Sequence, residues 1–135
     1  MFWVRMNYRI ENSILNALPL VASVSLLSAC GSVGDTAAVK NADELAVACK
    51  TQEALAAVDR ASQGGGFSAN IADLQRVVIL RDAGRRSEAD AAMAARNERA
   101  GADQEAAAEA EQSVARAIEQ LRAERMKQTG RSTCP

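Results

Sequence analysis

The chain has 135 residues, enough for one small domain, and its 16 basic and 17 acidic residues nearly balance. This balance excludes the strongly basic surface that nucleic-acid binding requires. The absence of histidine excludes histidine-dependent catalysis, zinc-protease motifs and most transition-metal sites. Acidic residues are numerous enough for paired-carboxylate hydrolysis, but aromatic residues that could line a sugar-binding cleft make up only 3% of the chain. Composition therefore predicts a protein that is not an enzyme and that uses no cofactor, metal or small-molecule substrate.

The first 29 residues differ sharply from the rest of the chain. Arg5 and Arg9 precede an apolar run of 14 residues, from 14 to 27, which is shorter than the roughly 20 residues that span a bilayer. A short basic segment, a short apolar segment and small residues at a cleavage site are typical of a secretory signal. Translation could start at Met1 or at Met6, since either leaves a basic segment before the run.

The apolar run ends in Leu27-Ser28-Ala29-Cys30, which resembles the lipobox of bacterial membrane lipoproteins. This resemblance implies that a diacylglyceryl group is attached to the Cys30 thiol and that the signal is cleaved between Ala29 and Cys30. Residue 31 is Gly rather than Asp, and the sorting rule of enteric-type bacteria then favours the periplasmic face of the outer membrane over the inner membrane. We expect a signal peptide over 1–29, a lipidated cysteine and flexible tether over 30–40, and a helical periplasmic domain over 41–135.

Alanine dominates the part of the chain after the predicted cleavage site. It contributes 26 residues, against 18 larger apolar residues, so helices form readily but bury little area. Such a small core needs a partner or a covalent link. With Cys30 lipidated, Cys49 and Cys134 remain as a pair in an oxidising compartment. A disulfide between them would contribute about 4–5 kcal/mol; two free thiols or an intermolecular bond are the alternatives.

The first two predicted helices are separated by a run of glycines. Asn41 resembles a helix cap, and a helix is expected from about 43 to 62, before the glycines at 64–66. No lysine follows these glycines, so they are a turn and not a phosphate-binding loop. The second helix is expected over 71–83 with a cap at Asn70 and the densest apolar cluster of the chain. A strand over 77–80 is disfavoured because no second strand is available to pair with it.

The segment 80–89 resembles the helical hairpin of a tetratricopeptide repeat over one unit, but stable arrays need several units. We therefore interpret it as a generic hairpin with its turn at 84–86. A third helix, capped by Ser87, is expected to end at Gly101, and Asp103 is expected to cap a fourth over 104–127. The alternative is one continuous helix of about 40 residues.

The fold class predicted is all-α, a small bundle of three or four helices. One face of the last helix carries Val114, Ile118, Leu121 and Arg125 at helical spacing. Closing this face internally gives a bundle, whereas closing it against another chain gives an alanine-rich coiled coil, so an oligomer stays possible. The arginines at 76, 81, 85 and 86, and the charges along the last helix, are interpreted as solvated, salt-bridged faces.

These features predict a lipid-anchored periplasmic protein that acts by protein–protein contact, as an accessory or assembly factor at the outer membrane. In outline it is similar to the pilotin lipoproteins of type II secretion, which are small helical bundles that carry a secretin subunit. One alternative is a structural envelope lipoprotein that oligomerises through the coiled coil, although such proteins typically end in lysine and this chain ends in Cys134-Pro135. Another is a plasmid-transfer lipoprotein of the exclusion type.

Overall fold

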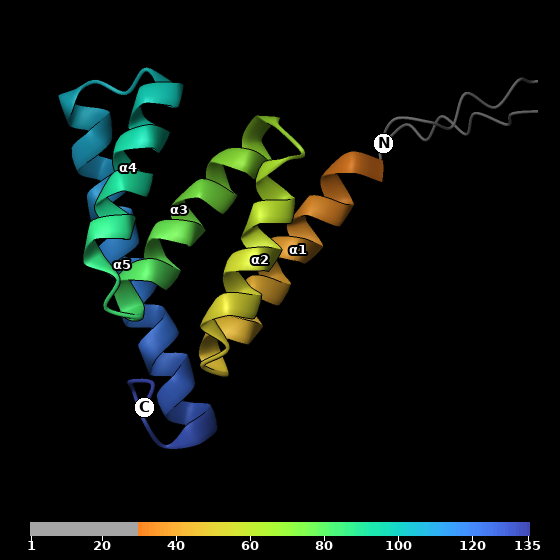
Figure 1. Cartoon of the computed structure of the whole chain (residues 1–135), viewed down its shortest axis with the longest axis vertical. Helices are drawn as coiled ribbons and strands as arrows, with labels where there is room; N and C mark the ends of the chain where they lie inside the picture. The colour runs from red at the N-terminus through yellow and green to blue at the C-terminus, as the bar shows by residue number, and fades with distance from the viewer. Residues whose placement is uncertain (1–29) are drawn as a thin grey trace, which may run out of the picture.

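The computed structural model describes residues 30–135, with side chains from residue 37 onward, so the predicted signal peptide lies outside the described residues. All regular elements in this part are α-helices, which confirms the all-α fold class (Figure 1). Five helices are present where three or four were expected. They are α1 (Cys30–Val47), α2 (Thr51–Ser62), α3 (Gly66–Asp82), α4 (Arg86–Ala100) and α5 (Gln104–Thr129).

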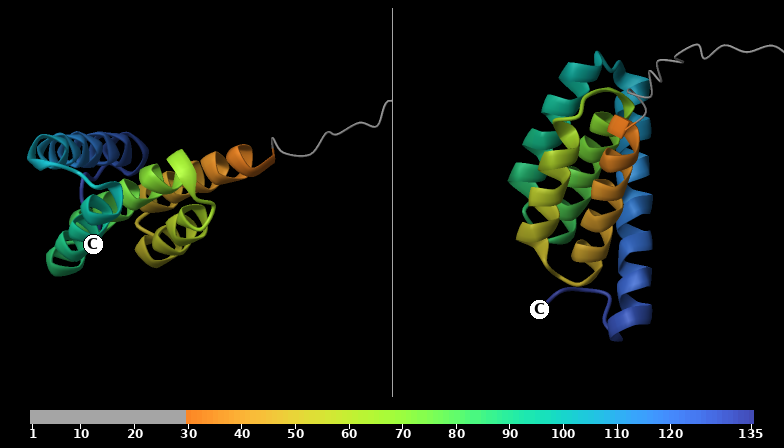
Figure 2. Two further views of the ribbon diagram at one scale, coloured as in Figure 1. Left: turned by 90° about the horizontal axis from the view of Figure 1, so that it is seen from above. Right: turned by 90° about the vertical axis from the view of Figure 1, so that its right-hand side faces the viewer.

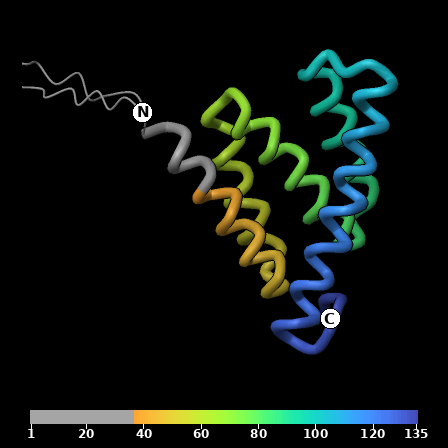
Figure 3. Tube along the Cα trace, turned by 180° about the vertical axis from the view of Figure 1, so that it is seen from behind, coloured from red at the N-terminus to blue at the C-terminus, as the bar shows by residue number. Residues whose placement is uncertain are grey.

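The helices form two layers around α3, which packs against each of the other four. α3 lies in the middle, with α2 and α4 on one side and α1 and α5 on the other (Figure 2). Consecutive helices run in opposite directions, so the turns gather at two ends (Figure 3). The Cys30 end holds the start of α1 and the turns at 63–65 and 101–103. The disulfide end holds the turns at 48–50 and 83–85 and the C-terminal segment 130–135.

Alanine forms much of the buried core. Ala42, Ala54, Ala57, Ala61 and Ala89 are fully buried, each with an exposed fraction of 0%. Side chains of this size let helix axes approach closely, because the distance between packed helices depends on the residues at the contact. The larger core residues, including Val58, Val77, Val114 and Leu80, fill the space around α3. The predicted hairpin at 80–89 is present as the α3–α4 turn, with Ala89 buried beneath it.

Two boundaries near the start of the domain differ from the prediction. Residues 30–40, expected to be a tether, belong to α1, and Ala38 and Val39 pack against the core. The helix expected over 43–62 is broken at 48–50. There Cys49 has a φ of 62°, and the N–H of Lys50 donates to the carbonyl oxygen of Leu45 at 2.9 Å. This is the Schellman helix ending, which glycine normally occupies; no glycine or proline marked it in the sequence.

Three of the four predicted helix caps are wrong. Asn41, Asn70 and Ser87 lie inside α1, α3 and α4, since each of these helices begins before the expected residue. Asp103 does cap α5, with its Oδ1 accepting the N–H of Ala106 at 2.9 Å. Gly101, with a φ of 58°, ends α4 in the left-handed conformation, so the single helix of about 40 residues does not form.

Candidate functional site

The predicted lipid-bearing residue, Cys30, is the first residue of α1. The helix therefore starts at this residue without an intervening tether. Ala29, and with it the predicted cleavage site, lies outside the described residues.

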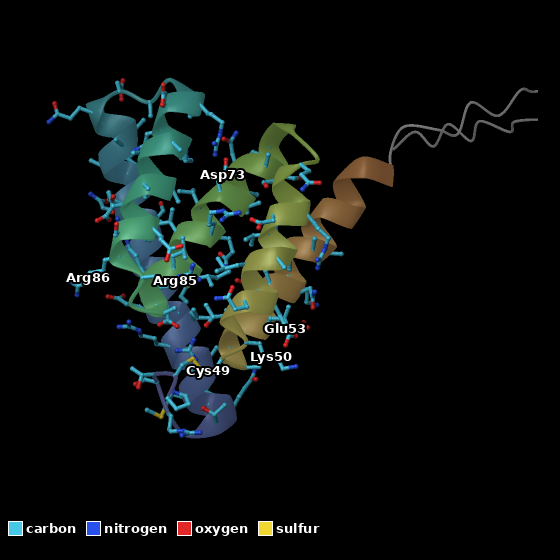
Figure 4. The ribbon with its side chains drawn as sticks, viewed as in Figure 1. Cys49, Lys50, Glu53, Asp73, Arg85 and Arg86 are labelled. Atoms are coloured by element: carbon cyan, nitrogen blue, oxygen red, sulfur yellow. A yellow bond between two sulfur atoms is a disulfide. The ribbon has the colours of Figure 1, made fainter. Side chains whose placement is uncertain are left out.

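The other two cysteines are joined at the opposite end of the molecule. Cys49 and Cys134 form a disulfide with an S–S distance of 2.11 Å and a Cα–Cα distance of 5.5 Å (Figure 4 labels Cys49). This is the pairing that the number of cysteines predicts. It connects the turn after α1 to the C-terminal segment, across a sequence separation of 85 residues.

A buried arginine lies at the same end of the molecule as the disulfide. Arg125 of α5 is 1% exposed. Its guanidinium donates to the carbonyl oxygens of Ala46 at 2.9 Å, Val47 at 3.3 Å and Ser132 at 2.9 Å. It also donates to the carboxylate of Asp82 at 2.5 Å. The arginine thus satisfies carbonyls at the end of α1, which have no partner within that helix.

Of the two interpretations of Arg125, as part of the apolar face of the last helix and as one of its solvated charges, the first is confirmed and the second is wrong. Arg125 follows Leu121 by four residues, which places it on the same, buried face of α5. Its carboxylate partner Asp82, at the end of α3, also accepts a hydrogen bond from Nε of Arg122 at 2.9 Å. Asp82 is nearly buried, with 6% of its side chain exposed.

A groove of about 650 Å³ lies between α2, α3 and α4. It opens toward the Cys30 end, because its lining comes from the last residues of α2, the first half of α3 and the second half of α4. Most of the lining residues are small. They are Ser62, Gly65, Ala69, Asp73, Arg76, Ala92, Ala95 and Arg99.

One ion pair lies on each side of this groove. Asp73 of α3, labelled in Figure 4, accepts a hydrogen bond from Nη2 of Arg99 on α4 at 2.7 Å. The side chain of Arg99 is 60% exposed, whereas that of Asp73 is 15% exposed. On the other side, Arg76 of α3 pairs with Asp59 of α2. The groove therefore presents charged groups of both signs above a floor of small side chains.

A smaller hollow of about 270 Å³ lies between α1, α3 and α5. At its rim, Nε2 of Gln75 donates to the carboxylate of Asp43. Asp43 as a whole is exposed, but its carboxyl group is partly buried between α1 and α3. This burial raises the pKa of the carboxyl group above 3.8, and the hydrogen bond from Gln75 opposes the shift. Apart from Asp43 and Glu124, its lining residues are uncharged, so the hollow offers no nucleophile and base in contact.

Three of the arginines that the sequence analysis placed on a salt-bridged face are indeed paired. Arg81 joins α3 to α5 through Glu111 at 2.5 Å, and the hydrogen bond from Arg81 lowers the pKa of the Glu111 carboxyl. Arg85 pairs with Glu88 at 2.5 Å. Arg76 pairs across to α2, as described above.

Among the side chains that the structure describes, from residue 37 onward, no three potential ligands among His, Cys, Asp and Glu lie close enough together to hold a metal ion. No helix in the same part of the chain combines the length and apolar character needed to cross a bilayer. Comparison of the chain with family models, curated proteins and solved structures finds no match.

Proposed function

We propose that this chain is a lipoprotein of the outer membrane, facing the periplasm, which binds a segment of an envelope protein in the groove between α2, α3 and α4. The observation that carries this proposal is the groove itself, which opens at the end where Cys30 lies and is lined by small residues and two ion pairs. An accessory or assembly factor needs such an open surface, held close to the membrane where its partner is inserted.

The lipobox at 27–30 supports the anchor. Because α1 begins at Cys30, acyl chains on this residue would hold the groove end of the domain next to the bilayer. Each buried methylene contributes about 0.8 kcal/mol, so two or three chains give stable attachment.

The lining of the groove favours an amphipathic helix as the bound segment. Ala69, Ala92 and Ala95 leave room for the side chains of one helix face, as in other helix-in-groove complexes. Arg99 is largely exposed, and exposed ion pairs contribute only about 0–1 kcal/mol. A carboxylate of the partner can therefore take the place of Asp73 on Arg99 at little cost.

The burial of one face of α5 argues against a structural envelope lipoprotein that oligomerises through a coiled coil. Val114 and Leu121, which would form the seam of a coiled coil, are 1% and 7% exposed within the single chain. Sedimentation of the purified protein tests this directly. We expect a monomer both before and after reduction, and a trimer that persists after reduction would favour the coiled coil.

The groove is tested by site-specific photocrosslinking in intact cells. A photoreactive amino acid at Ala92 should crosslink to one envelope protein, and Ala95→Trp should abolish this product by filling the groove. Ala94→Trp is the matched control, because Ala94 is exposed on the same helix but does not line the groove. Equal loss of the crosslinked product with Ala95→Trp and Ala94→Trp would refute the groove as the binding site. Equal crosslinking from a photoreactive amino acid at Ala94 and at Ala92 would refute it as well. Circular dichroism checks that each variant is folded.

The anchor is tested separately by Cys30→Ser. This variant should accumulate as an unlipidated precursor with its signal uncut, visible by mass spectrometry and by the absence of fatty-acid labelling. Maturation and membrane fractionation like those of the wild type would show that Cys30 is not the anchor.

A further inference from the structure

The segment 61–72, here called the uncharged tip, has an unusual composition for this chain. It contains no charged residue between Arg60 and Asp73, although 24% of the whole chain is charged. It forms the last residues of α2, the turn and the first residues of α3. Residues 63–67 are all exposed.

Phe67 gives the tip an apolar side chain that nothing in the domain covers. It is the only aromatic residue in the described part of the chain, and it is 80% exposed. Ile71, one helical turn later on the same face of α3, is 39% exposed. A single exposed apolar residue needs no explanation. Phe67 and Ile71 together, beside the exposed residues 63–66, form an apolar surface that does need an explanation.

The tip lies at the same end of the molecule as the start of α1 (Figures 1 and 2). Because α3 begins at this end, the Cα–Cβ bond of Phe67 is tilted toward it. Phe67 is two residues from both Gly65 and Ala69, which line the groove. Residues two apart on a helix do not share a face, so Phe67 points away from the groove and stays available when the groove is occupied.

The two carboxylates that flank the tip in sequence, Asp59 and Asp73, are both paired with arginines. Arg60, exposed in the last turn of α2, lies directly before the tip. No acidic residue occupies the first turn of α3, so no carboxylate there repels lipid phosphates. Basic residues beside an apolar group are typical of surfaces that bind anionic membranes.

We propose that the uncharged tip is a second membrane contact, in which Phe67 enters the boundary between phospholipid headgroups and acyl chains. The proposal rests on the lipid anchor at Cys30, which supplies a high local concentration of membrane, so that a weak contact suffices. With two points of contact the domain cannot rotate freely about its anchor. The groove is then held in a fixed orientation above the bilayer.

Tryptophan fluorescence of the lipidated protein in vesicles tests the contact. The one native tryptophan, Trp3, lies in the predicted signal peptide, so Phe67→Trp yields a mature protein with a single tryptophan. Phospholipids brominated at the top of the acyl chains should lower its emission about twofold or more, since interfacial side chains lie about 5–10 Å deep. Met126→Trp is the control, because Met126 is 48% exposed in the last turn of α5, at the disulfide end. Its emission should change little.

Flotation with the vesicles and the mass of the purified chain report on the anchor independently. If both variants float and carry lipid, but the Phe67→Trp variant is quenched no more than the Met126→Trp variant, the tip contact alone is overturned. A chain without lipid that does not float overturns the anchor as well.

The native side chain is tested with a photoactivatable phospholipid. Wild-type protein should be labelled mainly in the tryptic peptide 61–76, which cleavage at Arg60 and Arg76 releases. Phe67→Ser should remove most of this label, whereas Met126→Ser should not. Unchanged labelling after Phe67→Ser would overturn the role of Phe67.

Discussion

The two ends of the molecule are built in opposite ways. At the disulfide end, the Cys49–Cys134 bond, the buried Arg125 and its partner Asp82 connect α1, α3, α5 and the C-terminal segment. At the Cys30 end, a groove lies between α2, α3 and α4, and Phe67 is 80% exposed. The strongest links of the fold therefore lie far from the surfaces that we propose for function.

This division has a physical reason. A core in which alanine predominates supplies little stability, so a domain of this size needs additional links. With these links at one end, the other end can leave an apolar side chain exposed and a groove unfilled. Surfaces that bind partners are drawn from the less stable parts of proteins for the same reason.

Removal of the disulfide should have the largest effect. Cys49→Ser combined with Cys134→Ser should lower the free energy of unfolding by about 4–5 kcal/mol, because the bond restricts a loop of some 85 residues in the unfolded chain. Urea unfolding followed by circular dichroism measures the change, and chemical reduction of the wild type should reproduce it. A loss below about 1 kcal/mol would mean that the covalent link is not what stabilises this end.

Truncation of the buried arginine should come next. Arg125→Ala leaves the carboxylate of Asp82 buried with less compensation and removes the guanidinium hydrogen bonds to the carbonyls of Ala46 and Val47, which should cost about 3–5 kcal/mol. Arg122→Ala is the matched control. It binds the same carboxylate from a side chain that is 44% exposed, so about 1 kcal/mol or less is expected. Equal losses would show that burial does not distinguish the two arginines.

At the Cys30 end, loss of an ion pair should matter much less. Asp73→Asn removes the carboxylate that pairs with Arg99, whose side chain is 60% exposed, and should lower the free energy of unfolding by about 0–1 kcal/mol. The same urea titration measures this. A loss above about 2 kcal/mol would show that an ion pair stabilises this end strongly as well, so that the two ends would not differ as described.

The sequence predicted the fold class and the second half of the chain better than the first. Gly101 and Asp103 mark the α4–α5 turn by residue types that the conformation itself requires. The turn at Cys49 carries no such mark, because the ending that glycine would normally provide is occupied by a cysteine of the disulfide. The caps predicted at Asn41, Asn70 and Ser87 failed because each helix begins before the expected residue. Only in α1 does packing account for the extension, since Ala38 and Val39 pack against the core.

The groove could not be predicted, since it depends on how α2 and α4 pack against α3 and not on any motif. The buried arginine could have been predicted in part. Its position in the apolar series of α5 placed it on the buried face, but its partners lie on α1, α3 and the C-terminal segment. Periodicity indicates which face of a helix is buried and does not indicate what lies opposite.

The smallest expected effects concern pH, and two carboxylates should act with opposite signs. The pKa of Glu111 is lowered below 4.5 by the hydrogen bond from Arg81, so its stabilising contribution is present above that value and is lost as the pH falls through the pKa of the folded state. The pKa of Asp43 is raised above 3.8 by burial. Its contribution is therefore present below 3.8 and is lost as the pH rises through the raised pKa.

Melting temperatures measured from about pH 3 to about pH 7 separate the two carboxylates. Relative to the wild type, Glu111→Gln should be destabilised at neutral pH, and the difference should shrink in acid. Asp43→Asn should behave in the opposite way, becoming relatively more stable as the pH rises. Asp43 lines the same hollow as Val47, whose carbonyl binds Arg125, so comparison at several pH values, and not at one, isolates the effect of its ionisation. Parallel pH profiles for the two variants would show that burial of Asp43 between α1 and α3 does not control its ionisation.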